Sequence, residues 1–304
     1  MTVQSLGSTR APRSASRAAS HRRSRAVAAR ASKRAVVVLP GLGNNAKDYD
    51  GLADLLRDRL DVHVDVAQVA RLDWARNAAG LVDPNYWKGT LKPRPTVNWY
   101  LKRTEAAVKR AREATDGGPV TLLAHSAGGW MGRLYMMEYH ASLRHGVDAF
   151  VSLGSPHLPP PEGVIDQTRG ILTYLSEACG GCADEYVAYT TVAGRFLKGA
   201  ALGDRGASLQ RIVVGAGYQQ VCGDARAWGD GITPVETAHL PGAAQINIDA
   251  VYHSPLGEGP DRQWYGHPRF VPLWEQALMP GRGVSKDVTE VATEVEQGVE
   301  SAAV

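Results

Sequence analysis

Ser126 lies where an apolar run gives way to small residues, a setting that is typical of a serine nucleophile. Residues 119–125 predict a buried strand, and a helix is expected directly after the serine. Ala124 and Gly128, two positions away on each side, are small, as a sharp strand-to-helix turn requires. Such a turn lifts the hydroxyl out of the sheet, where the backbone amide of Ala127 can stabilise an oxyanion. The alternative interpretation is a serine that only caps the helix.

Two further groups would complete this chemistry: a base that takes the serine proton and a carboxylate that orients the base. Asp230 lies in a Gly-Asp-Gly turn that can direct its carboxylate at a histidine, although Asp-Gly also occurs in plain turns. Asp224 and Asp204 are weaker candidates. Among the nine histidines, His253 draws attention because it follows an apolar run and precedes a Ser-Pro pair.

The elements that would position these residues alternate between strands and helices, which predicts a mostly parallel sheet with helices on both faces. Residues 72–96 are expected to be an irregular excursion, and residues 157–186 a lid or cap with a helical stretch over 166–178. Residues 207–221 are ambiguous, because two glycines interrupt either period. Strands are expected at 35–39, 62–68, 119–125, 149–153, 187–192 and 245–252, and helices at 50–60, 97–114, 128–140 and 268–278.

The segment around Ser126 resembles the nucleophile elbow G-x-S-x-G of the α/β-hydrolase superfamily, with Ala124 in place of the first glycine. Upstream, Pro40-Gly41-Leu42-Gly43 is similar to the loop that supplies the second oxyanion donor in this superfamily. The resemblance implies that this donor is the backbone amide of Leu42. The alternative, a glycine-rich phosphate loop, lacks the G-x-G-x-x-G and G-K-[ST] patterns.

The later motifs resemble the same superfamily. Residues 229–234 (Gly-Asp-Gly-Ile-Thr-Pro) look like the G-D-G-x-[VT]-P loop of many lipases, which implies that Asp230 is the acid. His253 is on the loop after the last expected strand, where the superfamily carries its base, and His267 and His239 are the alternatives. The chain order of serine, aspartate and histidine is the order of this superfamily.

The resemblance extends from about residue 35 to residue 278 and is strongest to lipase-like and GPI inositol-deacylase-like plastid hydrolases of plants and algae. The turn at Leu153-Gly154-Ser155-Pro156-His157 is similar to one in triacylglycerol lipases and these deacylase-like proteins, and His157 either lines the acyl site or is structural. The fold implied is an α/β-hydrolase fold that lacks the first two strands and carries a small lid insertion.

The activity implied is hydrolysis of carboxylic esters through an acyl-enzyme on Ser126, with no cofactor and no metal. Four aromatic residues can build an apolar acyl pocket or simply belong to the core. A lipid or another hydrophobic ester is therefore the expected substrate. An acyltransferase with the same triad, a carboxylesterase for small esters and a non-catalytic binding protein stay open as alternatives. The four aromatic residues are Tyr86, Trp87, Trp99 and Tyr100.

Composition divides the 304-residue chain into a basic segment (1–34), a globular domain (35–281) and an acidic tail (282–304). The tail is expected to be disordered, with a marginal amphipathic helix as the alternative. The first 34 residues hold eight Arg and one Lys and no acid, which resembles a chloroplast transit peptide, with a mitochondrial one or a basic binding arm as alternatives. Removing these nine charges from the net charge of +3 leaves −6 for the rest, so no nucleic-acid partner is expected.

Two remaining patterns concern the lid and the membrane. The two cysteines of Cys179-Gly180-Gly181-Cys182 can form a reversible disulfide or be two unrelated loop cysteines. A zinc site is not expected, because Cys222 is the only other cysteine in the sequence. No apolar run approaches the ~20 residues of a membrane span. We therefore expect no transmembrane segment, while peripheral contact with a membrane is compatible with the sequence.

Overall fold

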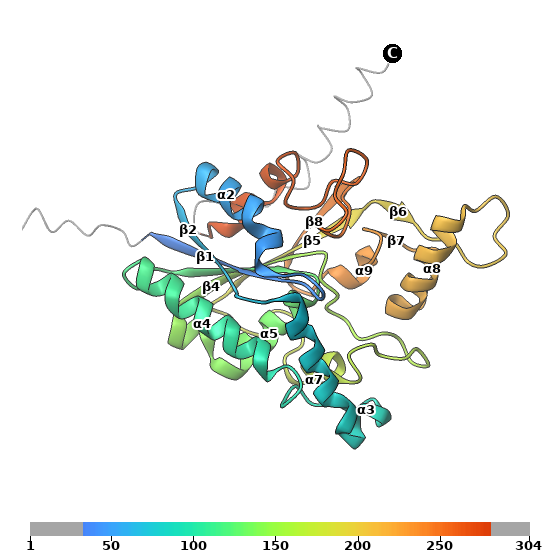
Figure 1. The fold of residues 1–304 in the computed structure, drawn as a ribbon, viewed down its shortest axis with the longest axis horizontal. Helices are drawn as coiled ribbons and strands as arrows, with labels where there is room; N and C mark the ends of the chain where they lie inside the picture. Colours follow the sequence, from blue (N-terminus) through green and yellow to red (C-terminus); the bar gives the residue numbers. More distant parts are fainter. Residues whose placement is uncertain (1–32, 281–304) are drawn as a thin grey trace, which may run out of the picture. The chain divides into compact units, whose positions relative to one another are not determined.

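A computed structural model describes residues 33–280, which form a six-stranded sheet covered by helices (Figure 1). The segment interpreted as a transit peptide, except for its last two residues, and the acidic tail lie outside the described residues. The strands are β1 (Arg34–Leu39), β2 (Val62–Val66), β3 (Val120–His125), β4 (Val147–Leu153), β5 (Ala188–Arg195) and β8 (Ala244–Asp249).

The strand order in the sheet is β2-β1-β3-β4-β5-β8, and every neighbouring pair is parallel. The mostly parallel sheet predicted from the sequence is therefore confirmed. The chain moves from β1 to β2 on one side and then returns to place β3 on the other side of β1. Such a reversal leaves a crevice at the carboxyl ends of the two central strands, and ligands of open α/β sheets bind there. The loop after β1 and Ser126 after β3 both lie at this crevice.

Alternation along the strands divides the core into two layers, because successive side chains point to opposite faces. One layer packs α4 (Asn98–Ala114), α5 (Ala127–Tyr139), α6 (Ala141–His145) and α7 (Ile171–Ala178) against residues such as Val37. The other packs α2 (Asp50–Arg59) and the C-terminal turns against residues such as Val36 and Val38. The two layers lie on opposite sides of the sheet in Figure 1.

The predicted closing helix at 268–278 is wrong. The chain forms two short 3-10 helices instead, η3 (Val271–Leu273) and η4 (Glu275–Leu278). Pro272 has no amide hydrogen to give an α-helix, and the amides of Leu273, Trp274 and Ala277 bond to the carbonyl three residues earlier.

The ambiguous segment 207–221 is a helix, α8 (Leu209–Cys222), with Ser208 accepting a capping bond from the Arg211 amide. Gly215 is needed there, because a side chain would approach the carbonyl oxygen of Ala200 to 2.2 Å. The interruption of the apolar pattern thus reflects close packing rather than the end of a helix.

The excursion after β2 consists of η2 (Arg71–Val82) and α3 (Pro84–Lys88). In the candidate lid, α7 begins at Ile171, later than the stretch predicted from 166, because the residues before it form a turn. Between β5 and β8 lie α8, α9 (Val235–Ala238) and a small antiparallel pair, β6 (Leu197–Lys198) with β7 (Trp228–Gly229). The remaining 3-10 turn, η1 (Ala46–Tyr49), precedes α2. Within residues 33–280 no helix is long and apolar enough to cross a membrane.

Candidate active site

Ser126 occupies the strained turn between β3 and α5. Its φ of 53° and ψ of −129° are unfavourable for a residue with a side chain, and such strain persists at sites where function requires it. A side chain at Gly128 would come within 2.4 Å of the Leu39 carbonyl oxygen, so the helix start packs directly against the end of β1. The Ser126 hydroxyl makes no capping bond to α5, so it is not merely an N-cap.

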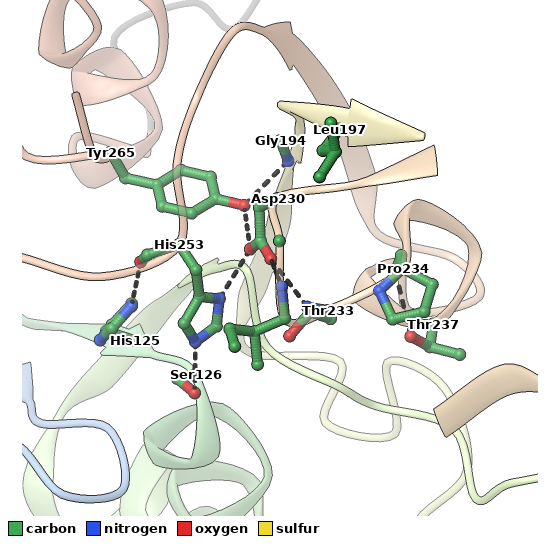
Figure 2. A network of polar contacts seen from close by, with 12 residues as sticks. His125, Ser126, Gly194, Leu197, Asp230, Thr233, Pro234, Thr237, His253 and Tyr265 are labelled. Carbon is green, nitrogen blue, oxygen red and sulfur yellow. Dashed lines mark hydrogen bonds and ion pairs between the residues drawn. The ribbon is translucent and has the colours of Figure 1, made fainter. Parts of the chain in front are cut away.

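The structure brings Ser126, His253 and Asp230 together in one chain of hydrogen bonds (Figure 2). His253 Nε2 lies 2.9 Å from Ser126 Oγ, and His253 Nδ1 lies 2.7 Å from Asp230 Oδ2. A neutral imidazole that donates from Nδ1 to the carboxylate leaves Nε2 free to accept the serine proton. Asp230 and His253 are buried, whereas Ser126 is partly exposed.

The Asp230 carboxylate receives hydrogen bonds on both oxygens. Oδ1 accepts from the amides of Ile232 (3.0 Å) and Thr233 (2.7 Å), as the tight glycine turn allows. Oδ2 accepts from the Tyr265 hydroxyl at 2.8 Å as well as from His253, and the Tyr265 oxygen accepts from the Gly194 amide at 2.8 Å. These four donors compensate the free-energy cost of burying the charged carboxylate.

A second polar chain connects the loop after β1 to the loop of His253. The Gly41 amide donates to the Tyr49 hydroxyl (2.9 Å), and this hydroxyl donates to His125 Nδ1 (2.7 Å). His125 Nε2 then donates to the backbone carbonyl of His253 at 2.8 Å. Burial, together with the neighbouring His253, lowers the pKa of His125 to about 3, so its ring is neutral and the tautomer follows from these bonds.

Leu42 and Ala127, the residues expected to supply the oxyanion amides, lie at the same cavity as the serine. A side-chain carbon on Gly41 would lie 2.7 Å from the Ser126 Cβ, so the backbone of the loop before Leu42 lies directly against the nucleophile turn. Ala127 is the first residue of α5, where an amide has no carbonyl partner within the helix. Leu42, Ser126 and Ala127 line the same cavity. This arrangement suits the binding of a negatively charged oxygen beside the serine.

The cavity in front of Ser126 has a volume of about 290 Å³ and mostly apolar walls. Of the predicted aromatic residues, Tyr86 lines it, Trp87 is exposed, and Trp99 and Tyr100 pack in or against the core. Further apolar lining comes from Trp74, Leu91, Val97, Trp130, Met131 and Leu172.

His157 does not line this cavity. It is buried beneath α5, with Nε2 2.8 Å from Ser152 Oγ, and burial holds its pKa well below the ordinary value. The alternative bases also lie elsewhere: His239 pairs with Thr191, and His267 accepts the Arg269 amide.

The alternative acids, Asp204 and Asp224, both bond to Arg226 instead of to a histidine. Cys179 and Cys182 are free thiols whose pKa values burial raises. In the described part of the chain no cluster of three or more His, Cys, Asp or Glu side chains is arranged to hold a metal ion.

Tyr265, His125 and Tyr49 are polar residues of this site that the sequence analysis did not single out. The one local signal is the position of His125 directly before the serine. Tyr265 has no pattern around it that indicates contact with Asp230, since 35 residues separate the two.

Comparisons with known proteins agree with this architecture. A family profile described as alpha/beta hydrolase fold matches residues 34–178. No curated protein matches the sequence. Phospholipase PlaB from Legionella pneumophila is similar in structure, with a TM-score of 0.54 at 12% identity over 87% of this chain and 63% of that chain.

Lipase BlEst2 from Bacillus licheniformis, in its propeptide form, is similar with a TM-score of 0.50 at 15% identity over 84% of this chain and 52% of that chain. This chain thus spans less than two thirds of the length of either protein, and at such low identity the likeness concerns the fold. The sheet topology and the family match together establish that the chain has the alpha/beta hydrolase fold.

Proposed function

We propose that this protein is a serine hydrolase that cleaves carboxylic esters of hydrophobic, lipid-like acids. The observation that carries the proposal is the hydrogen-bond chain from Ser126 Oγ through His253 to Asp230, with distances of 2.9 and 2.7 Å. Each distance is within the range required for proton transfer by a general base. The Ser126 end of this hydrogen-bond chain lies beside an apolar cavity, so a substrate carbonyl can reach the serine hydroxyl.

In the proposed mechanism, His253 Nε2 takes the Ser126 proton as the serine oxygen attacks the ester carbonyl. The amides of Leu42 and Ala127 donate to the carbonyl oxygen as it becomes negative. Asp230 stabilises the imidazolium that forms and keeps it oriented. The imidazolium then gives its proton to the departing alcohol, and water, activated by the same histidine, releases the acid from the acyl-enzyme.

The character of the cavity supports a hydrophobic acyl group. Its walls are mostly apolar, and two of its lining side chains, Leu42 and Ile232, are 63% and 54% exposed. Apolar side chains that line a pocket and also face solvent can contact the surface of a lipid phase. Peripheral contact with a membrane or micelle is therefore part of the proposal.

The test is hydrolysis of p-nitrophenyl esters with acyl chains from two to sixteen carbons. Ser126→Ala is expected to lower kcat about 10³-fold or more, because no other group can form the acyl-enzyme. Ser142→Ala is the matched control, since this serine is on α6 and does not line the cavity. The control is expected to keep its activity.

The acyl length with the highest kcat/KM separates a lipase-like enzyme from an esterase for small acids. Equal rates for the wild type and Ser126→Ala would contradict the proposal. A folded wild type with no activity on any ester of the series would also contradict it and favour a binding protein.

A further inference from the structure

The cavity beside Ser126 has two charged lining residues, Asp166 and Arg169, and both lie in the turn that precedes α7. The Asp166 carboxylate organises this turn. Oδ1 accepts from the amide and hydroxyl of Thr168, both at 2.7 Å, and Oδ2 accepts from the amide of Gly170 at 2.9 Å. Its oxygens are therefore already satisfied by the protein.

Arg169 is held in place by its backbone rather than by an ion pair. Its φ is +57°, a conformation that costs about 1–2 kcal/mol for a residue with a side chain. Its amide donates to the Asp166 carbonyl at 2.9 Å, and its carbonyl accepts from the Leu91 amide at 2.8 Å. A glycine would suit this turn better, so an arginine here suggests a use for its side chain.

The Arg169 guanidinium lies over the ring of Tyr86, 4.8 Å from the ring centroid, and Tyr86 lines the same cavity. Within residues 33–280 this stacking is the one contact of the guanidinium, which forms no ion pair and no hydrogen bond there. Stacking on an aromatic ring orients a guanidinium without using its N–H groups. The fork of donors thus remains available to a ligand in the cavity.

The size of the cavity indicates how a substrate would use this fork. Its volume of about 290 Å³ lies just below the usual range for small-molecule sites, and its mostly apolar walls suit an acyl chain. The alcohol part of an ester is expected beside the polar lining residues, which besides Arg169 include Asn77, Gln167 and Thr168.

We propose that Arg169 is a specificity-determining residue that binds an anionic phosphate group in the alcohol part of the ester substrate. The inference rests on the ester hydrolase function proposed above. Arginine matches phosphate because two of its N–H groups can bond to two phosphate oxygens at once. The substrate class is accordingly an acyl ester with a phosphate-bearing head group, as opposed to a neutral glyceride.

Binding of ether analogues tests this inference separately from catalysis. The two ligands are a 1-alkylglycerol and the matching 1-alkylglycerol 3-phosphate, which share one ten-carbon chain and lack a cleavable carbonyl. Their Kd values are measured, below the concentration at which they form micelles, for the wild type, Arg169→Gln, Arg169→Lys and a control, Arg269→Gln. The control arginine also stacks on an aromatic ring, Phe270, but does not line the cavity.

The wild type and the control are expected to bind the phosphate analogue at least about tenfold more tightly than the neutral one. Arg169→Gln is expected to remove most of this ratio without changing the Kd of the neutral analogue. Arg169→Lys is expected to keep part of it, because the charge remains and the fork is lost.

An unchanged ratio in Arg169→Gln, a wild-type ratio of one, or no binding of either analogue would overturn the inference. Inorganic phosphate is added as a competitor, and a Kd for free phosphate equal to that of the phosphate analogue would also overturn it. Hydrolysis of p-nitrophenyl esters reports separately on Ser126, so a failure of the proposed function is recognised independently.

Discussion

Asp230 shows how single residues prepare the proposed catalytic site. Its carboxylate is buried, and four donors reach it: two backbone amides of its own turn, the His253 ring and the Tyr265 hydroxyl. The amides hold one oxygen and leave the other for His253 and Tyr265. The direction of the carboxylate is thus set before any substrate arrives, which is the condition for electrostatic preorganisation.

Tyr265→Phe tests the contribution of this hydroxyl. The change removes one donor from Asp230 and leaves the buried Gly194 amide without its acceptor. We expect the free energy of unfolding to fall by about 1–3 kcal/mol, measured by urea denaturation, and kcat to fall while KM changes little. Tyr252→Phe is the matched control, for which a change within about 0.5 kcal/mol is expected. Equal stability of Tyr265→Phe and the wild type would show that this hydroxyl contributes nothing.

At the scale of elements, the site depends on how closely α5 approaches the end of β1. The turn at Ser126 directs α5 back across the sheet, and Gly128 and Gly129 form its first turn. A side chain at Gly129 would reach within 2.3 Å of Ser155, and one at Gly128 would reach the backbone of β1. The absence of side chains at these two positions allows the nucleophile turn, the end of β1 and the turn after β4 to meet.

Gly128→Ala is expected to destabilise the protein by about 1–3 kcal/mol or more, because the added carbon would lie 2.4 Å from a backbone oxygen that cannot rotate away. Gly217→Ala in α8 is the matched control. Nothing lies within 4 Å of its added carbon, so helix propensity is expected to leave it neutral or stabilise it by about 0.5–1 kcal/mol. Thermal unfolding of both variants measures the difference. Similar effects of the two substitutions would contradict this account of the packing.

For the whole molecule, the buried polar network makes stability depend on pH. His125 and His157 are fully enclosed, and burial lowers the pKa of both, that of His125 to about 3 and that of His157 well below its ordinary value. In the unfolded chain each titrates near its ordinary value of about 6.5. Below this pH the unfolded state therefore binds protons that the folded state does not, and stability is lost as the pH falls.

We expect the free energy of unfolding to be constant above about pH 7 and to fall between pH 6.5 and 5. The upper limit of this fall is about 1.4 kcal/mol per pH unit for each of the two histidines. Urea denaturation at half-unit pH intervals measures the slope, and His125→Gln is expected to reduce it. This window lies above the range where the carboxylates titrate. A flat profile from pH 7 to 5 would mean that both rings take up protons in the folded protein as they do in the unfolded chain.

The sequence pattern was sufficient to predict those features that depend only on residues close together in the chain. The strand before Ser126, the small residues around it and the Gly-Asp-Gly turn are local features, because a sharp turn requires small residues and a strand in a parallel sheet requires a continuous apolar run. The same local reasoning failed at 268–278, where the apolar spacing indicated a helix. Pro272 prevents that helix, and packing on the sheet stabilises 3-10 turns instead.

The sequence by itself thus determined the kind of fold and the set of residues that could do the chemistry. Only the tertiary structure decided that His253, rather than His239 or His267, meets Ser126 and Asp230. It alone also placed Tyr265 on the carboxylate, His125 under the base loop and Arg169 in the cavity. The physical reason is that such contacts join residues far apart in the chain, and the order of strands in the sheet, not their spacing in the sequence, decides which loops share an edge.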